Sequence, residues 1–338
     1  MKILLIGEFS GVHNNLRKGL IEIGHDVDLV STGDGWKKIG IKSNLLGKPG
    51  SKFSARLSRI IYPFINVSSL SKYDYVNVIG LQNKRPFIMK LLKNRNSSIG
   101  AFACGSDIYA VKHMLKREYS PIMGEAREDV YNLVNALNRT NDELNAKLMD
   151  CIIPMSRSYY EGVKHLSNST KAILNFPVHL KDYENQSNKI HEKIKIVHPI
   201  SRRGFKGSGF IIHALNELKK NYPAKVEIET FEKLAFHEYL EKIKESNIVV
   251  DQCYSYGYGM NALIAMSLGK IVMSGNYYDE ITPIIGIKPD TSMIYKKLEN
   301  LLTANIQELG EKSLDFVRFN HDSVNIAQKF INIINEEK

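Results

Sequence analysis

Two glycine-containing loops hold the residue types that bind phosphate. The first, HPISRRGFKGSGF, places Arg203 and Lys206 beside Gly207, between a predicted strand and a predicted helix. Guanidinium groups pair bidentately with phosphate oxygens, an ammonium supplies a point charge, and glycines allow close backbone approach. G-x-x-x-x-G-K-[ST] cannot be fitted here, so the loop is not a P-loop. The stretch predicts an anion site, and a basic surface turn is the alternative.

The second loop, DQCYSYGYGMN, follows the apolar run NIVV and leads into a helix that we expect to begin near Met260 or Asn261. A helix N-terminus presents unpaired N–H groups and partial positive charge, and Gly259 keeps side chains away from it. Tyr256 and Tyr258 could stack on a base or a sugar, and simple packing is the alternative for each. Two such loops in one half of the chain predict a diphosphate ligand.

The N-terminal half has two further loops that follow predicted strands, GEFSGVH and CGSD. The near-neutral pKa of histidine makes His13 a candidate general base, and Asp107 is another if it is desolvated. The alternatives are an imidazole that orders its loop and an N-cap for the helix IYAVKHML. No metal-ligand pattern accompanies these residues.

Strand and helix patterns alternate along the chain, which predicts two doubly wound parallel sheets. The polar, unperiodic segment 181–193 divides them as a linker. We therefore expect an N-terminal domain over 1–180 and a C-terminal domain over 194–322. The amphipathic pattern of 323–338 predicts a last helix, which we expect to pack back on the N-terminal domain.

The chain has 338 residues, is 43% hydrophobic and carries a formal net charge of +10, which indicates an anionic partner. Between Asp34 and Asp74 there are eight Lys or Arg and no acid. The basic, partly apolar segment 37–59 suits contact with an anionic membrane surface, and an exposed basic loop is the alternative. No nucleic-acid-binding motif is present, so we expect no nucleic acid partner.

Three cysteines without a CxxC pair argue against a disulfide framework or a structural zinc site. The apolar core of MKILLIGE is too short for a signal peptide, and no apolar run is long enough to span a membrane. These features predict a cytoplasmic protein, with any membrane contact peripheral and on the inner face.

Four stretches together resemble the GT-B glycosyltransferases, in particular family GT4 (glycosyltransferase group 1). LRKGLIEIGHDV resembles that family's first helix and the entry to its second strand, and GSD at 105–107 resembles its acceptor-domain turn, with Cys104 in place of the usual histidine. HPISRRGFKGS and VVDQCYSYGYGMNALIAMSLGKIVM resemble its donor loop and its nucleotide-sugar motif. The resemblance covers almost the whole chain.

The resemblance implies two Rossmann-like domains whose parallel sheets face each other across a cleft. It implies transfer of a sugar from a nucleotide-sugar to a glycan acceptor, such as a lipid-linked glycan of surface polysaccharide assembly, with retention of configuration and without metal or cofactor. The donor would be bound by the residues of the two phosphate-type loops: Arg203, Lys206, Gly207, Tyr256, Tyr258, Gly259, Met260 and Asn261. The acceptor would be bound by Gly11, Val12 and Ser106, with His13 and Asp107 as catalytic residues. We expect Arg203→Ala or Lys206→Ala to abolish transfer and leave the fold intact.

One departure concerns the two acids, E-x7-E, that the family commonly has in its nucleotide-sugar motif. The matching positions are Tyr256 and Ile264, neither of which can accept hydrogen bonds from a ribose as a carboxylate does. The alternative function is therefore a donor-site-impaired homologue that acts as a binding partner or scaffold. A dinucleotide-dependent oxidoreductase is disfavoured, because GEFSGV is not G-x-G-x-x-G.

Overall fold

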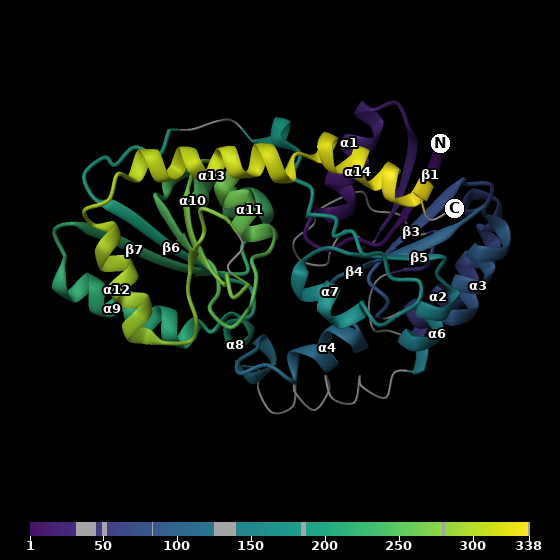
Figure 1. Ribbon diagram of the computed structural model, residues 1–338, viewed down its shortest axis with the longest axis horizontal. Coiled ribbons are helices and arrows are strands. Elements are labelled where there is room, and N and C mark those ends of the chain that lie inside the picture. The colour runs from purple at the N-terminus through teal and green to yellow at the C-terminus, as the bar shows by residue number, and fades with distance from the viewer. Residues whose placement is uncertain are drawn as a thin grey trace. The chain divides into compact units, whose positions relative to one another are not determined.

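The computed structural model describes residues 1–31, 45–48, 53–82, 84–124, 140–183, 187–278 and 281–336. The chain forms two compact units, each built from more than one segment. Unit 1 comprises Met1–His113, Asn135–His179 and Ser323–Lys338, and unit 2 comprises Met114–Val134 and Leu180–Asp322. Each unit contains one parallel sheet with helices on both faces (Figure 1).

Unit 1 contains a five-stranded sheet in the order β2-β1-β3-β4-β5, and every pairing in it is parallel. Apart from the edge strand β2, which exposes Asp26 and Asp28, its strands are largely apolar and buried on both faces, as expected of a parallel sheet that helices cover. Their bounds are β1 (Lys2–Ile6), β2 (Asp26–Val30), β3 (Tyr75–Ile79), β4 (Ile99–Ala103) and β5 (Cys151–Pro154).

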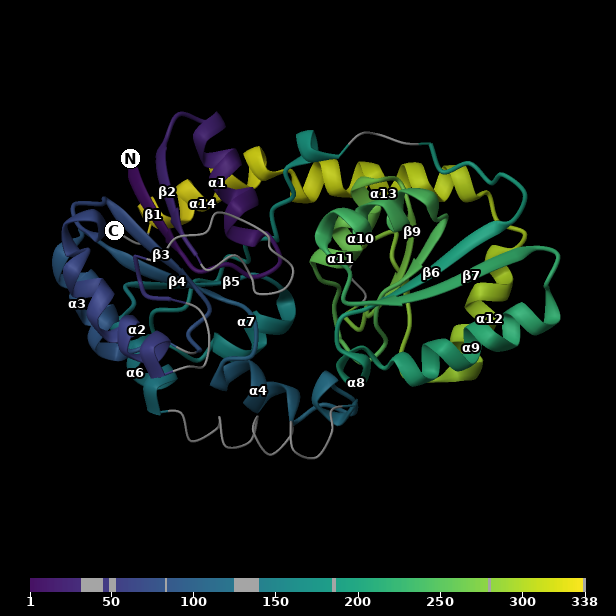
Figure 2. The ribbon, with the colours of Figure 1, turned by 180° about the vertical axis from the view of Figure 1, so that it is seen from behind.

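Two helices cover one face of this sheet, α1 (Val12–Glu22) and α14 (Ser323–Glu336). They pack closely at Gly19, where a Cβ would lie 2.1 Å from the carbonyl oxygen of Ser323. Phe330 of α14 packs on Tyr75 and Phe102 of the sheet. Figure 2 shows the remaining helices of this unit on the other side of the sheet. They are α2 (Phe53–Ile65), α3 (Pro86–Arg95), α4 (Ile108–Met114), α6 (Thr140–Leu148) and α7 (Arg157–Val163), with the 3-10 turn η2 (Val67–Leu70) after α2.

Unit 2 contains a second parallel sheet, in the order β10-β9-β8-β6-β7. Its strands are β6 (Ile194–Ile200), β7 (Val226–Glu232), β8 (Ile248–Val250), β9 (Ile271–Ser274) and β10 (Ile285–Gly286). Helices α9 (Ser208–Asn221) and α12 (Thr291–Leu301) pack together over one face and share a core with the strands. The other helices are α8 (Arg203–Lys206), α10 (Phe236–Glu245), α11 (Met260–Ser267) and α13 (Ile306–His321), with 3-10 turns η3 (Pro121–Gly124) and η5 (Leu180–Asp182).

The two parallel sheets predicted from the sequence are confirmed. Residues 114–134 belong to unit 2, although we had assigned them to the N-terminal domain. Between η3 and α6, residues 125–139 lie outside the described residues. Parts of the segment 37–59 also lie outside them, and its last part begins α2. Within the described residues, none of the helices has the length and apolar character needed to cross a membrane.

Candidate functional site

The strand order of unit 2 fixes where a ligand is expected. Strand β6 lies between β7 and β8, so the connections after β6 and β8 leave the sheet in opposite directions. In open parallel sheets, ligands bind at this switch point, outside the carboxyl ends of the strands. The two loops singled out in the sequence follow these two strands, since Ser201–Gly207 comes after β6 and Asp251–Gly259 after β8.

Helix α9 begins at this edge with an open N-terminus. Its N-cap, Gly207, has φ 72°, and a Cβ there would lie 2.3 Å from Cys253 Sγ, so only glycine fits. No side chain caps the helix, and within the described chain the amides of Ser208 and Gly209 have no hydrogen-bond partner. A Cβ at Gly209 would meet no atom within 4 Å. The helix therefore presents free N–H donors to open space.

Helix α11 begins in the same way. Gly259 is its N-cap and no side chain caps it. The amides of Met260, Asn261 and Ala262 have no partner among the described residues, and Gly259 has open space where a Cβ would stand. Two uncapped helix N-termini thus follow the two neighbouring strands of the switch point, which suits a ligand with two anionic groups.

Lys206 also lies at this edge, but it is buried rather than exposed on the loop. Its Nζ lies 2.7 Å from the carbonyl oxygen of Pro199 and 2.7 Å from Asp251 Oδ1, and both members of the ion pair are almost inaccessible. An ammonium has three N–H donors, so one remains for a ligand oxygen. Our expectation that Lys206→Ala leaves the fold intact does not suit this geometry, because removal of Lys206 leaves the Asp251 carboxylate buried without its cation.

His198 ties the first of these loops to the sheet. Its Nδ1 donates to the carbonyl oxygen of Val250 at 2.6 Å, and its Nε2 accepts from the hydroxyl of Ser208 at 2.8 Å. Burial, together with the nearby ammonium of Lys206, lowers the pKa of His198 to about 3. The imidazole is therefore neutral and positions the first residue of α9.

Arg203 is exposed and forms an ion pair with Glu232, the last residue of β7. An exposed pair of this kind contributes little to stability, so the guanidinium can exchange its carboxylate partner for a phosphate at small cost. The structure therefore leaves Arg203 able to take the predicted donor-binding role.

Tyr256 lies inside an aromatic cluster. Its ring stacks on Tyr277, with centroids 3.8 Å apart, and meets the edge of Tyr119 at 4.8 Å. The guanidinium of Arg117 lies 4.4 Å from the centroid of the Tyr256 ring. Tyr256 is 5% exposed, so packing, the alternative we gave for it, accounts for most of its ring.

Tyr258 and Ile264 also pack against other side chains of unit 2. Tyr258 contacts Phe316 and His321 of α13, and its hydroxyl lies 3.3 Å from His321 Nε2. Ile264, which stands where the family has its second acid, is buried in α11. Neither residue offers a polar group toward the two helix N-termini, so the anion-binding groups of this edge are the amides and cations.

In unit 1, His13 is fully buried. Its Nδ1 donates to the carbonyl oxygen of Gly7 at 2.9 Å, and its Nε2 accepts from the side-chain amide of Asn77 at 3.0 Å. Burial lowers the pKa of His13 to about 3. With both nitrogens engaged, the imidazole suits the loop-ordering role that we gave as the alternative to a general base.

Asp107 is buried as well and caps α4. Its Oδ1 accepts from the amide of Ala110 at 2.9 Å, in the N-cap pattern that we gave as the alternative to catalysis. Desolvation raises the pKa of Asp107 to about 7, and the nearby Asp142 contributes to the increase. The carboxyl group therefore titrates near neutrality, but at 1% exposure it reaches no solvent-borne substrate in this conformation.

The predicted acceptor residues lie at the carboxyl edge of the unit 1 sheet. Gly11 is the uncapped N-cap of α1 with φ 89°, Val12 is buried behind it, and Ser106 is partly exposed after β4. No group of three or more potential metal-ligating His, Cys, Asp or Glu side chains occurs within the part of the chain that the structure describes.

No family model and no curated protein matches this chain. Solved structures match over nearly its full length. Sucrose-phosphate synthase from Thermosynechococcus elongatus is 14% identical with a TM-score of 0.65, and the match covers 99% of each chain. The chain has the GT-B fold.

Further GT-B structures resemble it to a similar degree. WaaG, a glycosyltransferase involved in lipopolysaccharide biosynthesis, is 14% identical with a TM-score of 0.62, covering 98% of this chain and 99% of that one. A UDP-GlcNAc 2-epimerase from Neisseria meningitidis, bound to UDP-GlcNAc, is 12% identical with a TM-score of 0.60, covering 99% and 100%. At such identities the likeness establishes GT-B architecture, and the chemistry must be argued from the residues.

Sequence reasoning missed residues on which this edge of the GT-B chain depends. Asp251 was passed over because its partner is 45 positions away, and His198 because it was treated as part of a strand. The stretches HPIS and VVDQ carried the only available signal for the two. Arg117 and Tyr119 reach the Tyr256 cluster from a segment that the sequence had assigned to the other domain.

Proposed function

We propose that this GT-B protein is a glycosyltransferase that uses a nucleotide-sugar donor. The observation that carries the proposal is the pair of uncapped helix N-termini, α9 and α11, beside Lys206 at the switch point of unit 2. A nucleoside diphosphate has two anionic groups of matching chemistry. Structural relatives whose names include UDP or UDP-GlcNAc support the same ligand class.

In the proposed reaction, the bond between the sugar and the diphosphate breaks, a glycosidic bond to an acceptor hydroxyl forms, and the leaving diphosphate takes the hydroxyl proton. Negative charge accumulates on the leaving oxygen in the transition state. The amides of Gly209 and Asn261, the remaining N–H of Lys206 and the guanidinium of Arg203 are the groups that would stabilise it. The start of α9 and the ammonium of Lys206 are held in place before the reaction, since His198 fixes the first and Asp251 the second. These fixed charges would serve without a metal, and retention of configuration stays a prediction.

The proposed acceptor is a glycan, and a lipid-linked one is favoured by α2. This helix has no acidic residue and exposes a row of large apolar side chains: Phe53, Leu57, Ile60, Ile61, Phe64 and Ile65. An exposed apolar patch of this kind marks an interaction surface, and basic residues beside it suit an anionic membrane. We therefore propose that the protein acts at the inner face of a membrane.

Two other functions give different results in the same assays. A UDP-sugar epimerase is favoured by the epimerases among the GT-B structures that resemble this chain. It would convert the donor without any acceptor. A donor-site-impaired scaffold is favoured by the burial of Tyr256 and Ile264. It would bind no nucleotide.

The test is calorimetric titration with UDP, GDP, dTDP and CMP, followed by an assay for transfer from the matching nucleotide-sugars. The decisive variant is Arg203→Gln, which removes an exposed guanidinium and should leave stability unchanged. Loss of a charged hydrogen bond predicts roughly 10- to 100-fold weaker nucleotide binding. Lys219→Gln, an equal charge change at the far end of α9, is the control. If Arg203→Gln binds as the wild type does, the donor assignment is wrong.

A further inference from the structure

A cavity of about 560 Å³ opens in unit 1, and the loop after β1 contributes Gly7 to its lining. It lies beside the carboxyl ends of β1 and β2, where Ile6, Gly7, Val30 and Ser31 form its floor. Helices α2 and α3 contribute its walls, and so does the short described segment 45–48. Its volume is that of an ordinary small-molecule site.

The segment 45–48 is fastened to α2, so this wall is built into the fold. The hydroxyl of Ser58 accepts from the amide of Lys48 at 2.8 Å, and Arg59 donates to the carbonyl oxygen of Lys48. At Gly47, with φ 110°, a Cβ would lie 2.5 Å from the Cα of Arg59. The backbone of the segment therefore rests directly on the helix.

Three cations line this cavity, Arg59, Lys84 and Arg85, and none of the described lining residues is acidic. No side-chain hydrogen bond joins Lys84 or Arg85 to another described residue; the buried carboxylate of Asp142 acts on Lys84 only through its charge, and Arg85 lies 6.0 Å from the centroid of the Phe87 ring. The ammonium of Lys84 lies against the loop after β1, where a Cβ on Gly7 would stand 3.5 Å from its Nζ. Burial lowers the pKa of Lys84 to about 8, so it is still mostly charged at neutral pH.

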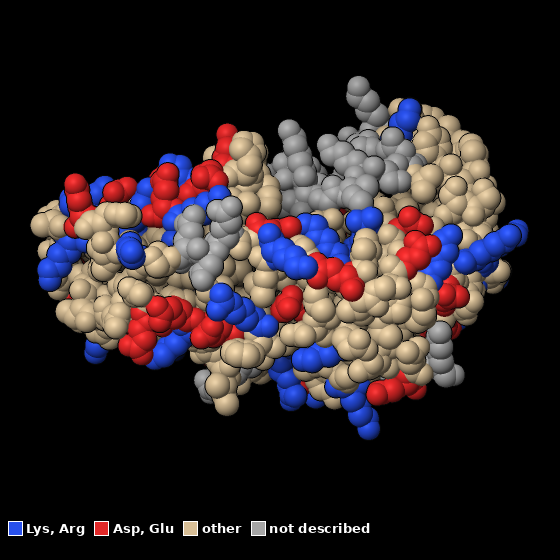
Figure 3. Space-filling model, turned by 90° about the horizontal axis from the view of Figure 1, so that it is seen from above, with Lys and Arg blue, Asp and Glu red and all other residues tan. Residues whose placement is uncertain are grey.

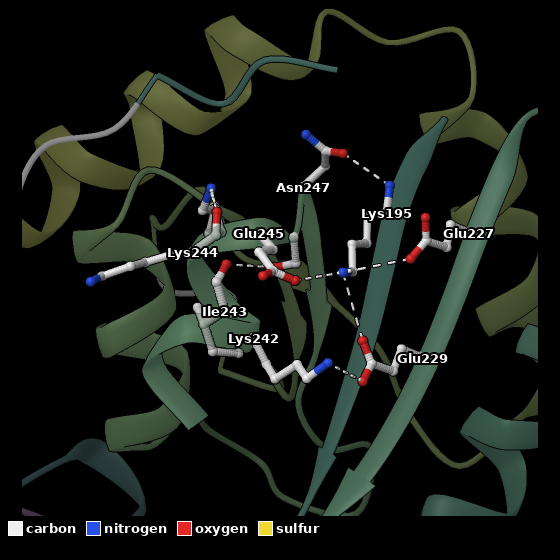
Figure 4. Close-up of polar contacts among 10 residues, drawn as sticks. Lys195, Glu227, Glu229, Lys242, Ile243, Lys244, Glu245 and Asn247 are labelled. Carbon is white, nitrogen blue, oxygen red and sulfur yellow. Dashed lines mark hydrogen bonds and ion pairs between the residues drawn. The ribbon is translucent and has the colours of Figure 1, made fainter. Parts of the chain in front are cut away.

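Several cations elsewhere on the molecule lie beside acids. On the face drawn in Figure 3, basic and acidic side chains lie interspersed over the described surface. In unit 2, Lys195 lies 2.8 Å from Glu245 and within 3.7 Å of Glu227 and Glu229, and Lys242 shares Glu229 (Figure 4). The described lining of the unit 1 cavity has no acid, and the nearby Asp142 is buried outside that lining, so an anion that enters the cavity meets its cations without a competing carboxylate in the lining.

The remaining walls are apolar, and they continue to the exposed face of α2. Leu46, Pro63, Ile88 and Met89 line the cavity. Phe64 of α2 stacks on Phe87 of α3, with centroids 6.1 Å apart, and both rings are about half exposed. An anion that enters here therefore meets both cations and apolar side chains.

We propose that this cavity binds the phosphate group of an anionic lipid, with Lys84, Arg85 and Arg59 on the phosphate and α2 seated in the lipid surface. The proposed lipid-binding site does not depend on the glycosyltransferase function proposed above. That the bound lipid is the sugar acceptor rests on the function proposed above.

The test uses the full chain without any nucleotide-sugar, so its failure is separate from failure of the donor site. Binding is measured to phosphatidylcholine vesicles with and without phosphatidylglycerol, to water-soluble dihexanoyl phosphatidic acid, and to inorganic phosphate. We expect binding to the anionic vesicles and to the short lipid, and much weaker binding to inorganic phosphate. If inorganic phosphate competes equally well, the ligand is a free phosphate compound and the lipid assignment is wrong.

Two classes of variant separate the cavity from the apolar face. Lys84→Met and Arg85→Gln should each weaken binding of the short lipid roughly 10- to 100-fold. Phe64→Ser should leave that affinity unchanged and reduce vesicle binding. Lys171→Gln, an exposed lysine of the same unit outside the cavity, is the charge-matched control and should change neither.

Stability distinguishes a binding lysine from a structural one. Because Lys84→Met removes a partly buried ammonium whose charged form the protein disfavours, its melting temperature should equal or exceed that of the wild type while lipid binding falls. A lower melting temperature with unchanged lipid affinity would make Lys84 structural and overturn the proposal. A wild-type dimer that Phe64→Ser dissociates, with no vesicle binding, would show that a second copy covers α2 instead.

Discussion

Replacing Lys206 by methionine should destabilise unit 2 strongly. The side chains of Lys206 and Asp251 are 4% and 3% exposed, and 2.7 Å separates Nζ from Oδ1. At an effective dielectric constant of about 20, two charges at that distance attract by roughly 6 kcal/mol, most of which the desolvation of both ions offsets. Removal of one partner leaves the other charge buried, so Lys206→Met should lower the free energy of unfolding by about 3–5 kcal/mol.

The matched variant is Lys206→Met combined with Asp251→Asn. It removes both charges and keeps a polar group of the same shape at 251, so it should recover most of the lost stability. Because the two units need not unfold together, the measurement is hydrogen exchange of β6 and β8 peptides across a urea series, which reports on unit 2. A loss below about 1 kcal/mol for the single variant, or no recovery in the double, would refute the buried ion pair.

The double variant also measures what Lys206 contributes to the ligand. It should fold, and it lacks the ammonium, so its affinity for the preferred nucleoside diphosphate isolates the remaining N–H of Lys206. We expect roughly 10- to 100-fold weaker binding. Lys206→Ala alone cannot give this result, because loss of fold and loss of a phosphate contact would both abolish transfer.

Two further predictions concern single sites. The pKa of Asp107 is raised from 3.8 to about 7, so between these pH values the folded state holds a proton that the unfolded state has lost. Asp107 therefore lowers the free energy of unfolding by about 1.4 kcal/mol per pH unit as pH rises through this range. Asp107→Asn keeps the N-cap and should remove that slope in urea unfolding of unit 1 at several pH values, whereas an unchanged slope would contradict the buried carboxyl. Gly207→Ala should lower the free energy of unfolding by at least about 1 kcal/mol, because φ is 72° and the Cβ would meet Cys253. Gly209→Ala has open space around its Cβ and should be neutral or slightly stabilising in thermal unfolding. Equal effects of the two variants would contradict the described start of α9.

The sheets were predictable because buried parallel strands are short apolar runs and each is followed by a loop with distinctive residues. The alternation of strand and helix patterns along the chain was enough to predict NIVV and IKIVHPI as strands whose following loops lie at the ligand-binding edge of a sheet. Loops containing Gly207 and Gly259 were identified because glycine at a strand-to-helix turn indicates a left-handed backbone or a close approach that a side chain would block.

Side-chain partnership was not predictable in the same way. A lysine in a glycine-containing loop indicates a phosphate site whether it is exposed or, as Lys206 is, held by a buried aspartate from another strand. For His13 the sequence left two roles open, and the choice depended on Asn77 and Gly7, which only the folded sheet brings to its two nitrogens. No periodic pattern or neighbouring glycine marks Lys84 and Arg85 in the sequence. Their cavity is formed by elements distant in the chain, so it could not be predicted from local patterns.

The contact between α14 and unit 1 has a consequence for biosynthesis. Phe330 covers Tyr75 and Phe102, and the start of α14 lies against Gly19, yet α14 is the last described helix to leave the ribosome. Until then, one face of the first sheet to be synthesised has no such cover. Unit 1 is therefore begun before unit 2 and is completed only after residues 180–322 have been synthesised, so Tyr75 and Phe102 lack the cover of Phe330 until then.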